Sequence, residues 1–431
     1  GVTKELSATS YWLLQLVLCL QKVVNALLKV RGLVKDSRIF MAVQWLRKKL
    51  GPVGVEEQQD QLQWRLYWEH FFPAMLFFVL LFSADSLSFI FFLPGLLFSS
   101  SFPRRIRPVL LWSAWSFVSA LLAPSFPSAV ISFFQETTIV LSGLAAGFYS
   151  RGKREWFQII LLSLALVISL TFLQAYAAPP FPPSWVPLSE KGKIPFRVTG
   201  AGDNPNLTGL YLAYMLPLLL VGWESKNGYW KKIESSCSGI LFFLSLPALI
   251  FTFSRTSWVA AVFTLVFYWL PNEKGKIIRL ILVIIIIVCI FPPLVARILH
   301  HPFQSGTFEY RVRIWKETWG LVQKHPVTGV GKEALIFHLH HTQTMRADHL
   351  HNLYLQLIVE KGIPSLFIIF WMVYNFILIP SSRSIHQSSL LERGIRAALL
   401  GQLVAGLTES VWNPPLLHFL FWFGFALLRE D

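Results

Sequence analysis

Long apolar segments are the feature that most constrains how this chain can fold. Residues 276–295 read KIIRLILVIIIIVCIFPPLV, and a run of about 20 mostly apolar residues is long enough to cross the hydrocarbon core of a bilayer. Only 14% of the 431 residues are charged, whereas soluble domains usually carry about 25%. The sequence therefore predicts an all-α, polytopic integral membrane protein, and it excludes soluble enzymes, fibrous proteins and disordered chains.

We interpret the apolar segments as about 12 transmembrane helices. Their expected ranges are 71–83, 86–99, 108–123, 127–149, 156–178, 205–222, 238–252, 255–270, 276–295, 352–379, 394–411 and 414–428. The first two are short and rich in Phe, and Asp85 between them favours a tight hairpin. One long kinked helix is the alternative, and it would reverse the orientation of every later span.

We expect four parts along the chain. They are a cytoplasmic amphipathic and basic region at 1–65, nine transmembrane helices within 66–295, a large external loop containing short helices at 296–351, and three transmembrane helices within 352–431. Apolar residues recur at helical spacing within 10–50, which favours a helix on the membrane surface. A first transmembrane helix at 10–30 is the alternative.

The net charge of +15 would suggest a nucleic-acid partner in a soluble protein. Here the basic residues lie in short connections between apolar spans, so we expect membrane lipids and no nucleic acid as partners. If the spans alternate, five connections on one side hold three Lys or Arg each: 103–107, 150–155, 223–236, 271–279 and 380–396. The opposite connections 84–86, 124–126 and 412–413 hold none. The positive-inside rule therefore places the five basic connections in the cytoplasm.

Several arginines on the expected external side lie close to a membrane boundary. They are Arg197, Arg255, Arg311 and Arg313. A lone arginine at the end of a span is most often a membrane anchor, but several on one face suit a phosphate or diphosphate, because a guanidinium binds oxygens in a bidentate manner. In RVTGAGDNPN at 197–206, Asn204 and Asn206 are suited to cap the following helix. The N-terminus of that helix also favours an anion.

A histidine is the candidate base. His351 is the last polar position before a long apolar span, so we expect it at the external water boundary, where a neutral imidazole can take a proton from a hydroxyl. A histidine that only forms hydrogen bonds is the alternative. The neighbouring FHLHH and DHLH segments contain no HExxH or CxxC spacing, and the chain has no DxD pair. We therefore expect no metal site, and arginines would neutralise a diphosphate instead.

Four segments in this order resemble the O-antigen ligase and polymerase superfamily (WaaL and Wzy, with the Wzy_C domain). They are RVTGAGDNPN, FSRTSW, RVRIW followed by HPVTGVG, and HNLYLQLIVEKGIPSLF. His351 and Asn352, followed after nine residues by Gly362, are similar to the family signature, although Ser365 stands where the family has a second glycine. The resemblance covers about residues 70–430.

The resemblance implies a metal-independent, inverting glycosyltransferase in the bacterial inner membrane, with its active face in the periplasm and a place in lipopolysaccharide biosynthesis. Such an enzyme needs no cofactor and moves a glycan from an undecaprenyl-diphosphate carrier to a lipid or glycan acceptor. The essential histidine of the family maps onto His351. Arg197 is the first candidate diphosphate ligand, and Arg255, Arg311 and Arg313 compete for the second. Ligase and polymerase share these motifs.

Inorganic carbon transporters of the IctB type are another branch of the superfamily that resembles the chain. They share the NPN and SR segments and a similar extra N-terminal region. A bicarbonate carrier needs polar residues along a path through the membrane, and apart from Asp85 and Glu136 we find little such material in the spans. The sequence therefore favours the enzyme, and a scaffolding protein would not need His351 and the arginines on one face.

Overall fold

The computed structural model of the chain describes residues 106–151, 155–178, 180–182, 194, 196–202, 204–225, 232–270, 306–342, 347–378 and 390–428. All of them belong to one structural unit, Phe78–Asp431. The N-terminal region 1–65, the hairpin expected at 71–99 and the span expected at 276–295 lie outside the described residues.

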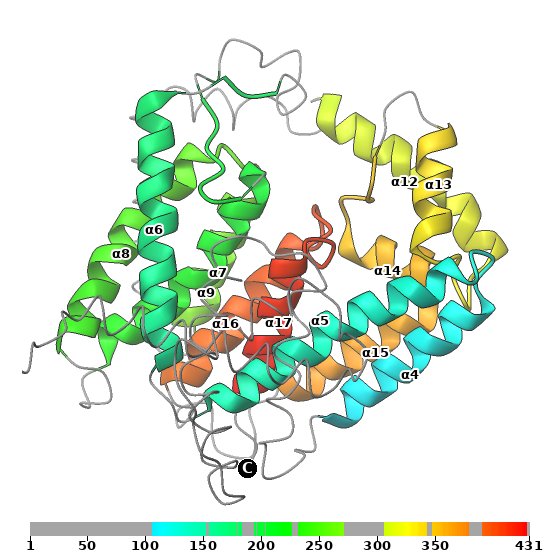
Figure 1. The fold of residues 1–431 in the computed structure, drawn as a ribbon, viewed down its shortest axis with the longest axis horizontal. Coiled ribbons are helices and arrows are strands. Elements are labelled where there is room, and N and C mark those ends of the chain that lie inside the picture. Colours follow the sequence, from blue (N-terminus) through cyan, green and yellow to red (C-terminus); the bar gives the residue numbers. More distant parts are fainter. Residues whose placement is uncertain are drawn as a thin grey trace, which may run out of the picture. The chain divides into compact units, whose positions relative to one another are not determined.

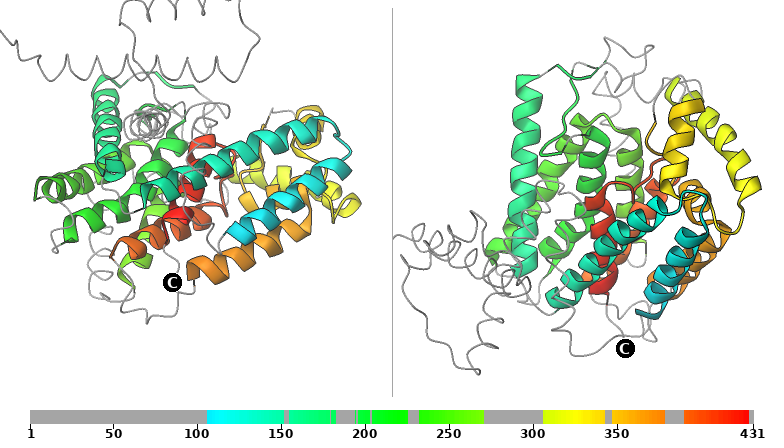
Figure 2. Two further views of the ribbon diagram at one scale, coloured as in Figure 1. Left: turned by 60° about the horizontal axis from the view of Figure 1, so that its bottom comes forward. Right: turned by 45° about the vertical axis from the view of Figure 1, so that its right-hand side comes forward.

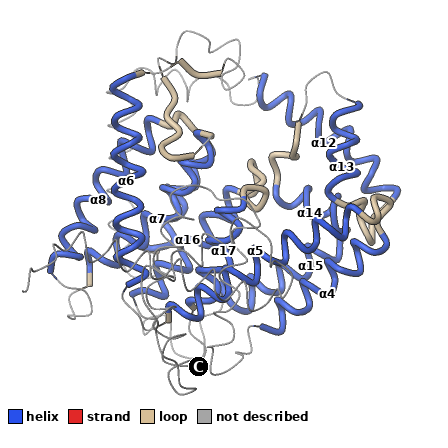
Figure 3. Tube along the Cα trace, viewed as in Figure 1, coloured by secondary structure: helices blue, strands red, loops and turns tan. Residues whose placement is uncertain are grey.

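Every regular element in this part of the chain is a helix, and Figure 3 shows no strand there. The first half contains α4 (Ile106–Leu122), α5 (Ser128–Ser150), α6 (Glu155–Ala177), α7 (Pro205–Glu224), α8 (Lys232–Phe251) and α9 (Arg255–Trp269). The second half contains α12 (Gly306–Lys324), α13 (Lys332–Thr342), α14 (Leu353–Lys361), α15 (Ile363–Val373), the π-helix η4 (Tyr374–Leu378), α16 (Leu390–Ala405) and α17 (Pro415–Leu427).

Four of these helices, α5 to α8, are long and apolar enough to cross a membrane. Shorter apolar helices occur at Arg107–Leu122, Ile363–Leu378 and Pro415–Leu427. The prediction of an all-helical fold is therefore confirmed for the described residues, and these candidate spans agree with a membrane protein. The spans expected between 108 and 270 coincide with α4 to α9 to within a few residues, except that α8 begins earlier, at Lys232.

The core of the described part is built around α7, which packs against α8, α9 and α16 (Figure 1). In its most apolar stretch, 83% of the residues are buried. α17 packs along α5, where glycines allow close approach of the two backbones. A Cβ atom on Gly147 would lie 2.5 Å from the Phe423 carbonyl oxygen and the Ala426 Cβ.

The span expected at 352–379 is wrong as a single helix. It is divided into α14, α15 and η4, with the first break at Gly362. Gly362 has φ of 78°, and a Cβ there would meet the Val327 carbonyl. Such a backbone conformation favours glycine and ends α14, and Pro364 stands near the start of α15. The helix therefore changes direction where the sequence suggested a continuous span.

The described part of the large expected loop contains the helices α12 and α13, as predicted. Figure 2 shows them side by side. Between them, residues 325–331 form a turn, in which Gly329 and Gly331 have positive φ. The turn is tied to α4 and to the connection after it, because the Ser119 and Ser125 hydroxyls donate to the Thr328 and Val330 carbonyls. These contacts fix the region that carries Arg311 and the histidines.

Candidate functional site

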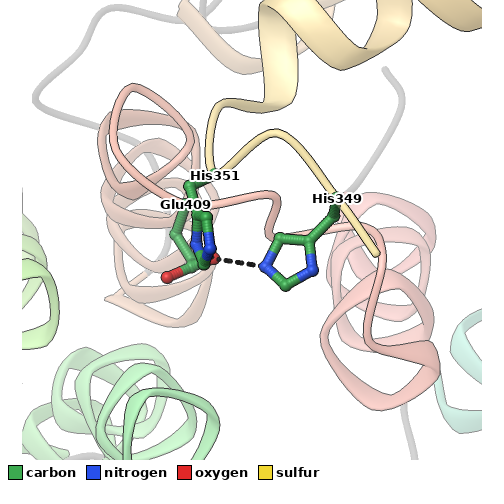
Figure 4. A group of neighbouring side chains, drawn as sticks. All are labelled: His349, His351 and Glu409. Atoms are coloured by element: carbon green, nitrogen blue, oxygen red, sulfur yellow. Dashed lines mark hydrogen bonds and ion pairs between the residues drawn. The ribbon is translucent and has the colours of Figure 1, made fainter. Parts of the chain in front are cut away.

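A buried glutamate organises the candidate site. Glu409 lies in the connection between α16 and α17 and is only 6% exposed. Its Oε1 is 2.9 Å from His351 Nδ1 and 3.1 Å from His349 Nε2 (Figure 4). Its Oε2 accepts a hydrogen bond from Asn206 Nδ2 at 3.3 Å and lies 3.6 Å from an Arg311 nitrogen. One carboxylate thus joins α7, α12 and the segment before α14.

The segment that carries His351 is held by the next connection in space. Asn352 caps α14, because its side chain accepts the Leu355 backbone N–H at 2.9 Å. Its own amide donates to the Leu407 carbonyl at 3.0 Å, and its backbone N–H donates to Ser410 Oγ at 3.3 Å. His351 itself has φ of 50°, which is uncommon for a residue other than glycine. The cap and the cross-links to the α16–α17 connection hold it there.

Helix α12 supports the same segment from the other side. Trp315 Nε1 donates to the Leu350 carbonyl at 2.7 Å. Arg311 lies one turn before Trp315 and therefore on the same face of α12, and one of its terminal nitrogens lies near Glu409. Trp319, one turn after Trp315, is 50% exposed.

The charges of the His351–Glu409 pair follow from their surroundings. Burial alone would raise the pKa of Glu409, but the adjacent His351 and the hydrogen bonds from both histidines hold that pKa well below its usual value. Burial lowers the pKa of His351, and this outweighs the opposing effect of Glu409. At neutral pH the pair is therefore a carboxylate and a neutral imidazole. The hydrogen-bond network then assigns the proton to Nδ1, which leaves Nε2 as a proton acceptor.

Arg197 is buried at the start of the RVTGAGDNPN segment, with 6% of its surface exposed. Its Nε donates to the Thr252 carbonyl at 3.1 Å, and a terminal nitrogen donates to Asn206 Oδ1 at 3.2 Å. Burial, and then repulsion by Arg255, lower the pKa of Arg197 to about 10. The guanidinium is thus held charged against a second cation, an arrangement that favours a bound anion.

The structure brings three of the four predicted arginines together. Arg255 is the first residue of α9, and its charge also lowers the pKa of Arg311, for which burial is the larger cause. Arg255 therefore lies within electrostatic reach of both Arg197 and Arg311. Arg313 has an exposed side chain, and two residues along a helix point to different faces. It does not join this group.

The two predicted asparagines differ in what they contact. Asn204 is the N-cap of α7, and its side chain accepts the Asn206 backbone N–H at 2.8 Å. Asn206 instead connects the two halves of the site, since it accepts from Arg197 and donates to Glu409. Its backbone carbonyl accepts from Ser257 Oγ at 3.2 Å, which fixes α7 against α9.

His349, His351 and Glu409 could also hold a metal ion, because one ligand atom from each lies within 4.8 Å of the others. The second oxygen of Glu409 is already engaged by Asn206 and Arg311. Nearby guanidinium charges oppose a cation, so the donor set suits a proton-transfer pair better than a metal centre. Elsewhere on the loop, His340 pairs with Asp348 at 2.9 Å and His341 stacks on Phe337.

Glu409 is the residue that sequence reasoning missed. The segment VAGLTESVW was placed inside and just after an expected span at 394–411, but α16 ends at Ala405 and a turn follows. One signal was present in the sequence. An acidic residue followed by Asn413 and two prolines marks an external connection that is longer than the expected 412–413.

Comparison with known protein families finds a match for part of the chain. Residues 240–370 match the model of the Wzy_C family, which is described as O-antigen ligase. This range includes Arg255, Arg311, His349 and His351, whereas Arg197 and Glu409 lie outside it. A search of curated proteins finds no match to the chain.

Proposed function

We propose that this chain, which carries an O-antigen ligase (Wzy_C) domain at residues 240–370, is a membrane glycosyltransferase of the O-antigen ligase type. It takes a glycan from an undecaprenyl-diphosphate carrier and passes it to a lipid or glycan acceptor. The reaction takes place at the periplasmic face of the bacterial inner membrane. The observation that carries the proposal is a histidine–glutamate pair beside three arginines.

His351 acts as the general base. Glu409 accepts a hydrogen bond from the Nδ1–H group and orients the ring, so that Nε2 takes the proton of the acceptor hydroxyl. The acceptor oxygen attacks the anomeric carbon while the bond from that carbon to the diphosphate oxygen breaks. The proton ends on His351, and the neighbouring carboxylate stabilises the imidazolium that forms. This is a single displacement, and it inverts the anomeric configuration.

The arginines stabilise the leaving diphosphate. Arg197 and Arg255 repel each other in the free protein, and a diphosphate between them would relieve that repulsion. Arg311 contributes a third positive charge and also contacts Glu409, so it links the donor side of the site to the base. Preorganised cations in a buried site stabilise developing negative charge without a metal ion.

Transfer by the purified full-length protein tests the proposal. The donor is an undecaprenyl-diphosphate-linked glycan, the acceptors form a panel of lipid A–core and free glycans, and released undecaprenyl diphosphate is measured. We expect release by the wild type and none by His351→Ala. His341→Ala is the matched control, because His341 is exposed and stacks on Phe337. Release by His351→Ala at the wild-type rate would show that His351 is not the general base.

An inorganic carbon transporter is the second candidate, and one observation favours it. A carrier needs polar residues within its spans. The sequence suggested little beyond Asp85 and Glu136, but in the structure Glu360, Lys361 and His418 line the same cavity as Glu136. Lys361 pairs with Glu136. Uptake of labelled bicarbonate by proteoliposomes, with unchanged uptake in His351→Ala, would support this candidate over the enzyme.

A further inference from the structure

A polar cavity of about 90 Å³ lies beside the candidate site. Residues of α4, α5, α14 and α17 line it, together with part of the α16–α17 connection. Its lining includes hydroxyl, amide, carboxylate and ammonium groups, among them Ser116, Gln135, Glu136, Gln356, Lys361 and Asn413. The volume exceeds the space that one water molecule needs. The cavity therefore has room for a polar guest.

Three buried polar atoms in the cavity wall have no hydrogen-bond partner among the described residues. They are Ser116 Oγ, Trp412 Nε1 and His418 Nε2, on side chains that are 4%, 7% and 2% exposed. Buried polar groups in native proteins are nearly always hydrogen-bonded, because leaving them unpaired is costly. These atoms come from α4, α17 and the connection before α17, and their convergence on one cavity points to an occupant that offers several hydrogen-bonding groups.

The positive and negative charges around the cavity balance. Glu136 and Glu360 stand against Lys332 and Lys361 in the lining. Lys361 is already paired with Glu136, and the Glu360 carboxylate accepts from Gln356 Nε2 at 2.7 Å. A phosphate or bicarbonate ion would therefore meet no excess of positive charge. A neutral polyhydroxyl compound can instead donate to the carboxylates and accept from Ser116.

Aromatic surface completes the match to a sugar ring. Trp412 stacks on His418 with ring centroids 5.2 Å apart, and Phe133 also lines the cavity. The C–H faces of a pyranose pack on such rings, while its hydroxyls satisfy the polar wall. Hydroxyl donors and acceptors together with an apolar face are the combination that this lining requires.

The cavity lies next to the candidate base, because residues close in sequence to His351 and Glu409 line it. Ser410 lines it and directly follows Glu409, and Leu353 lines it two residues after His351. Gln356 also lines it, and its Oε1 accepts the backbone N–H of Leu350 at 3.4 Å. A molecule seated in the cavity therefore lies next to the segments that position His351 and Glu409.

We propose that this cavity binds a neutral sugar ring of the acceptor and so presents a neighbouring hydroxyl to His351. The proposal rests on the glycosyltransferase function above and adds a site for the acceptor, separate from the arginines that face the donor. Ser116, Trp412 and His418 are binding residues in this account, and they take no part in proton transfer.

Two variants test the acceptor site with little change in packing. Ser116→Ala removes a hydroxyl that has no protein partner among the described residues, and His418→Phe keeps the ring that stacks on Trp412. Ser245→Ala is the matched control, because that buried hydroxyl bonds only within α8, to the Leu241 carbonyl at 2.7 Å. With the acceptor that the wild type consumes, we expect each test variant to raise the acceptor KM about threefold to tenfold. The donor KM and kcat should stay within about twofold of the wild type.

An acceptor KM that is unchanged in both test variants, with transfer intact, overturns the acceptor site and leaves water as the occupant. If the wild type transfers no glycan, the proposed function fails separately. Binding is then measured by saturation-transfer NMR with methyl glycosides of hexoses and N-acetylhexosamines. Glycoside binding that Ser116→Ala weakens supports the sugar site. Binding of neither class of glycoside overturns it.

Discussion

Glu409 is the residue on which the site depends. Its two oxygens contact two histidines, Asn206 and Arg311, so it joins the proposed base to the proposed anion site. A carboxylate in this position fixes the tautomer of His351 and stabilises the charge that develops on the ring. Asparagine or glutamine there would keep a hydrogen bond but lose the charge.

Glu409→Gln should lower kcat by about 10²- to 10⁴-fold, which is the usual range for efficient general-base catalysis. The carboxylate of Glu409 raises the pKa of His351, so its removal lowers that pKa further. The acid limb of the pH–rate profile should therefore move to lower pH in the variant. A limb that moves to higher pH would contradict the assigned pair.

The wild-type pH profile follows from the same pair. The pKa of His351 is lowered by burial, and only the neutral ring can act as a base. Activity should thus be constant around pH 7 and fall only below the ordinary histidine value of about 6.5. Initial rates of carrier release between pH 4.5 and 8, chosen as about two units on either side of that value, test this. Loss of activity that begins above pH 7 would show that another group titrates.

Arg197→Lys should raise the donor KM about tenfold, because lysine keeps the charge but loses the bidentate geometry. Arg313→Ala is the control and should leave the KM unchanged, since its side chain is exposed. Donor KM is measured with the acceptor saturating, and thermal unfolding confirms that both variants fold. Equal KM values for the two variants would mean that Arg197 does not contact the diphosphate.

Much of the site can be predicted at the residue scale. His351 and the arginines at 197, 255 and 311 stand in polar segments between apolar spans, and the structure places them near one another. Arg313 could not be separated from Arg311 without the helix orientation. Glu409 was missed because it has apolar residues on both sides and was therefore assigned to an expected span. Contacts across about 200 residues of sequence, such as that of Asn206 with Glu409, leave no local pattern.

At the element scale, the paired helices α5 and α17 are held by close backbone contact. Gly147 faces the Phe423 carbonyl and Ala426 with no room for a larger side chain. Gly147→Leu should lower the free energy of unfolding by about 1–3 kcal/mol, the usual cost of overpacking. Thermal unfolding of the full chain in detergent measures the effect.

Gly320→Ala is the matched control on α12, since an added Cβ there meets nothing within 4 Å. It should stabilise the protein by up to about 1 kcal/mol through helix propensity. Stabilisation by both substitutions would show that only helix propensity is being measured and would contradict the close α5–α17 contact.

Helix boundaries were predictable where capping residues are local. Asn204 before Pro205 caps the start of α7, as the sequence suggests. Ser254 before Arg255 caps the start of α9 in the same way. The break after α14 was not predicted, although Gly362 and Pro364 stand there. The flanking residues are apolar enough to continue a span, and the 325–331 turn that packs against Gly362 is distant in sequence. Tertiary packing decides that break.

At the scale of the whole molecule, a helical membrane protein follows from composition and the lengths of the apolar segments. The count of about 12 spans and the cytoplasmic placement of the basic connections stay predictions, because 71–99 and 276–295 lie outside the described residues. The charged residues Glu136, Glu360 and Lys361 were visible in the sequence. Their shared cavity was not, because it depends on how α4, α5, α14 and α17 pack.

The assembled enzyme should work without a metal ion. In the proposed mechanism, arginines take the place of a metal cation at the diphosphate, and the Glu409 carboxylate is already engaged by protein groups. Dialysis against EDTA should therefore leave the rate of transfer unchanged, and added Zn²⁺ should not raise it. Loss of activity that Zn²⁺ restores would instead assign His349, His351 and Glu409 to a metal site.

The central claim is a single displacement in which His351 deprotonates the acceptor while arginines hold the departing diphosphate. The anomeric configuration of the new linkage tests this most directly. A donor of defined configuration is supplied to the purified full-length protein, and the product is examined by NMR. The account predicts a linkage of inverted configuration. A retained configuration would contradict it, because retention requires two successive displacements through a glycosyl–enzyme intermediate.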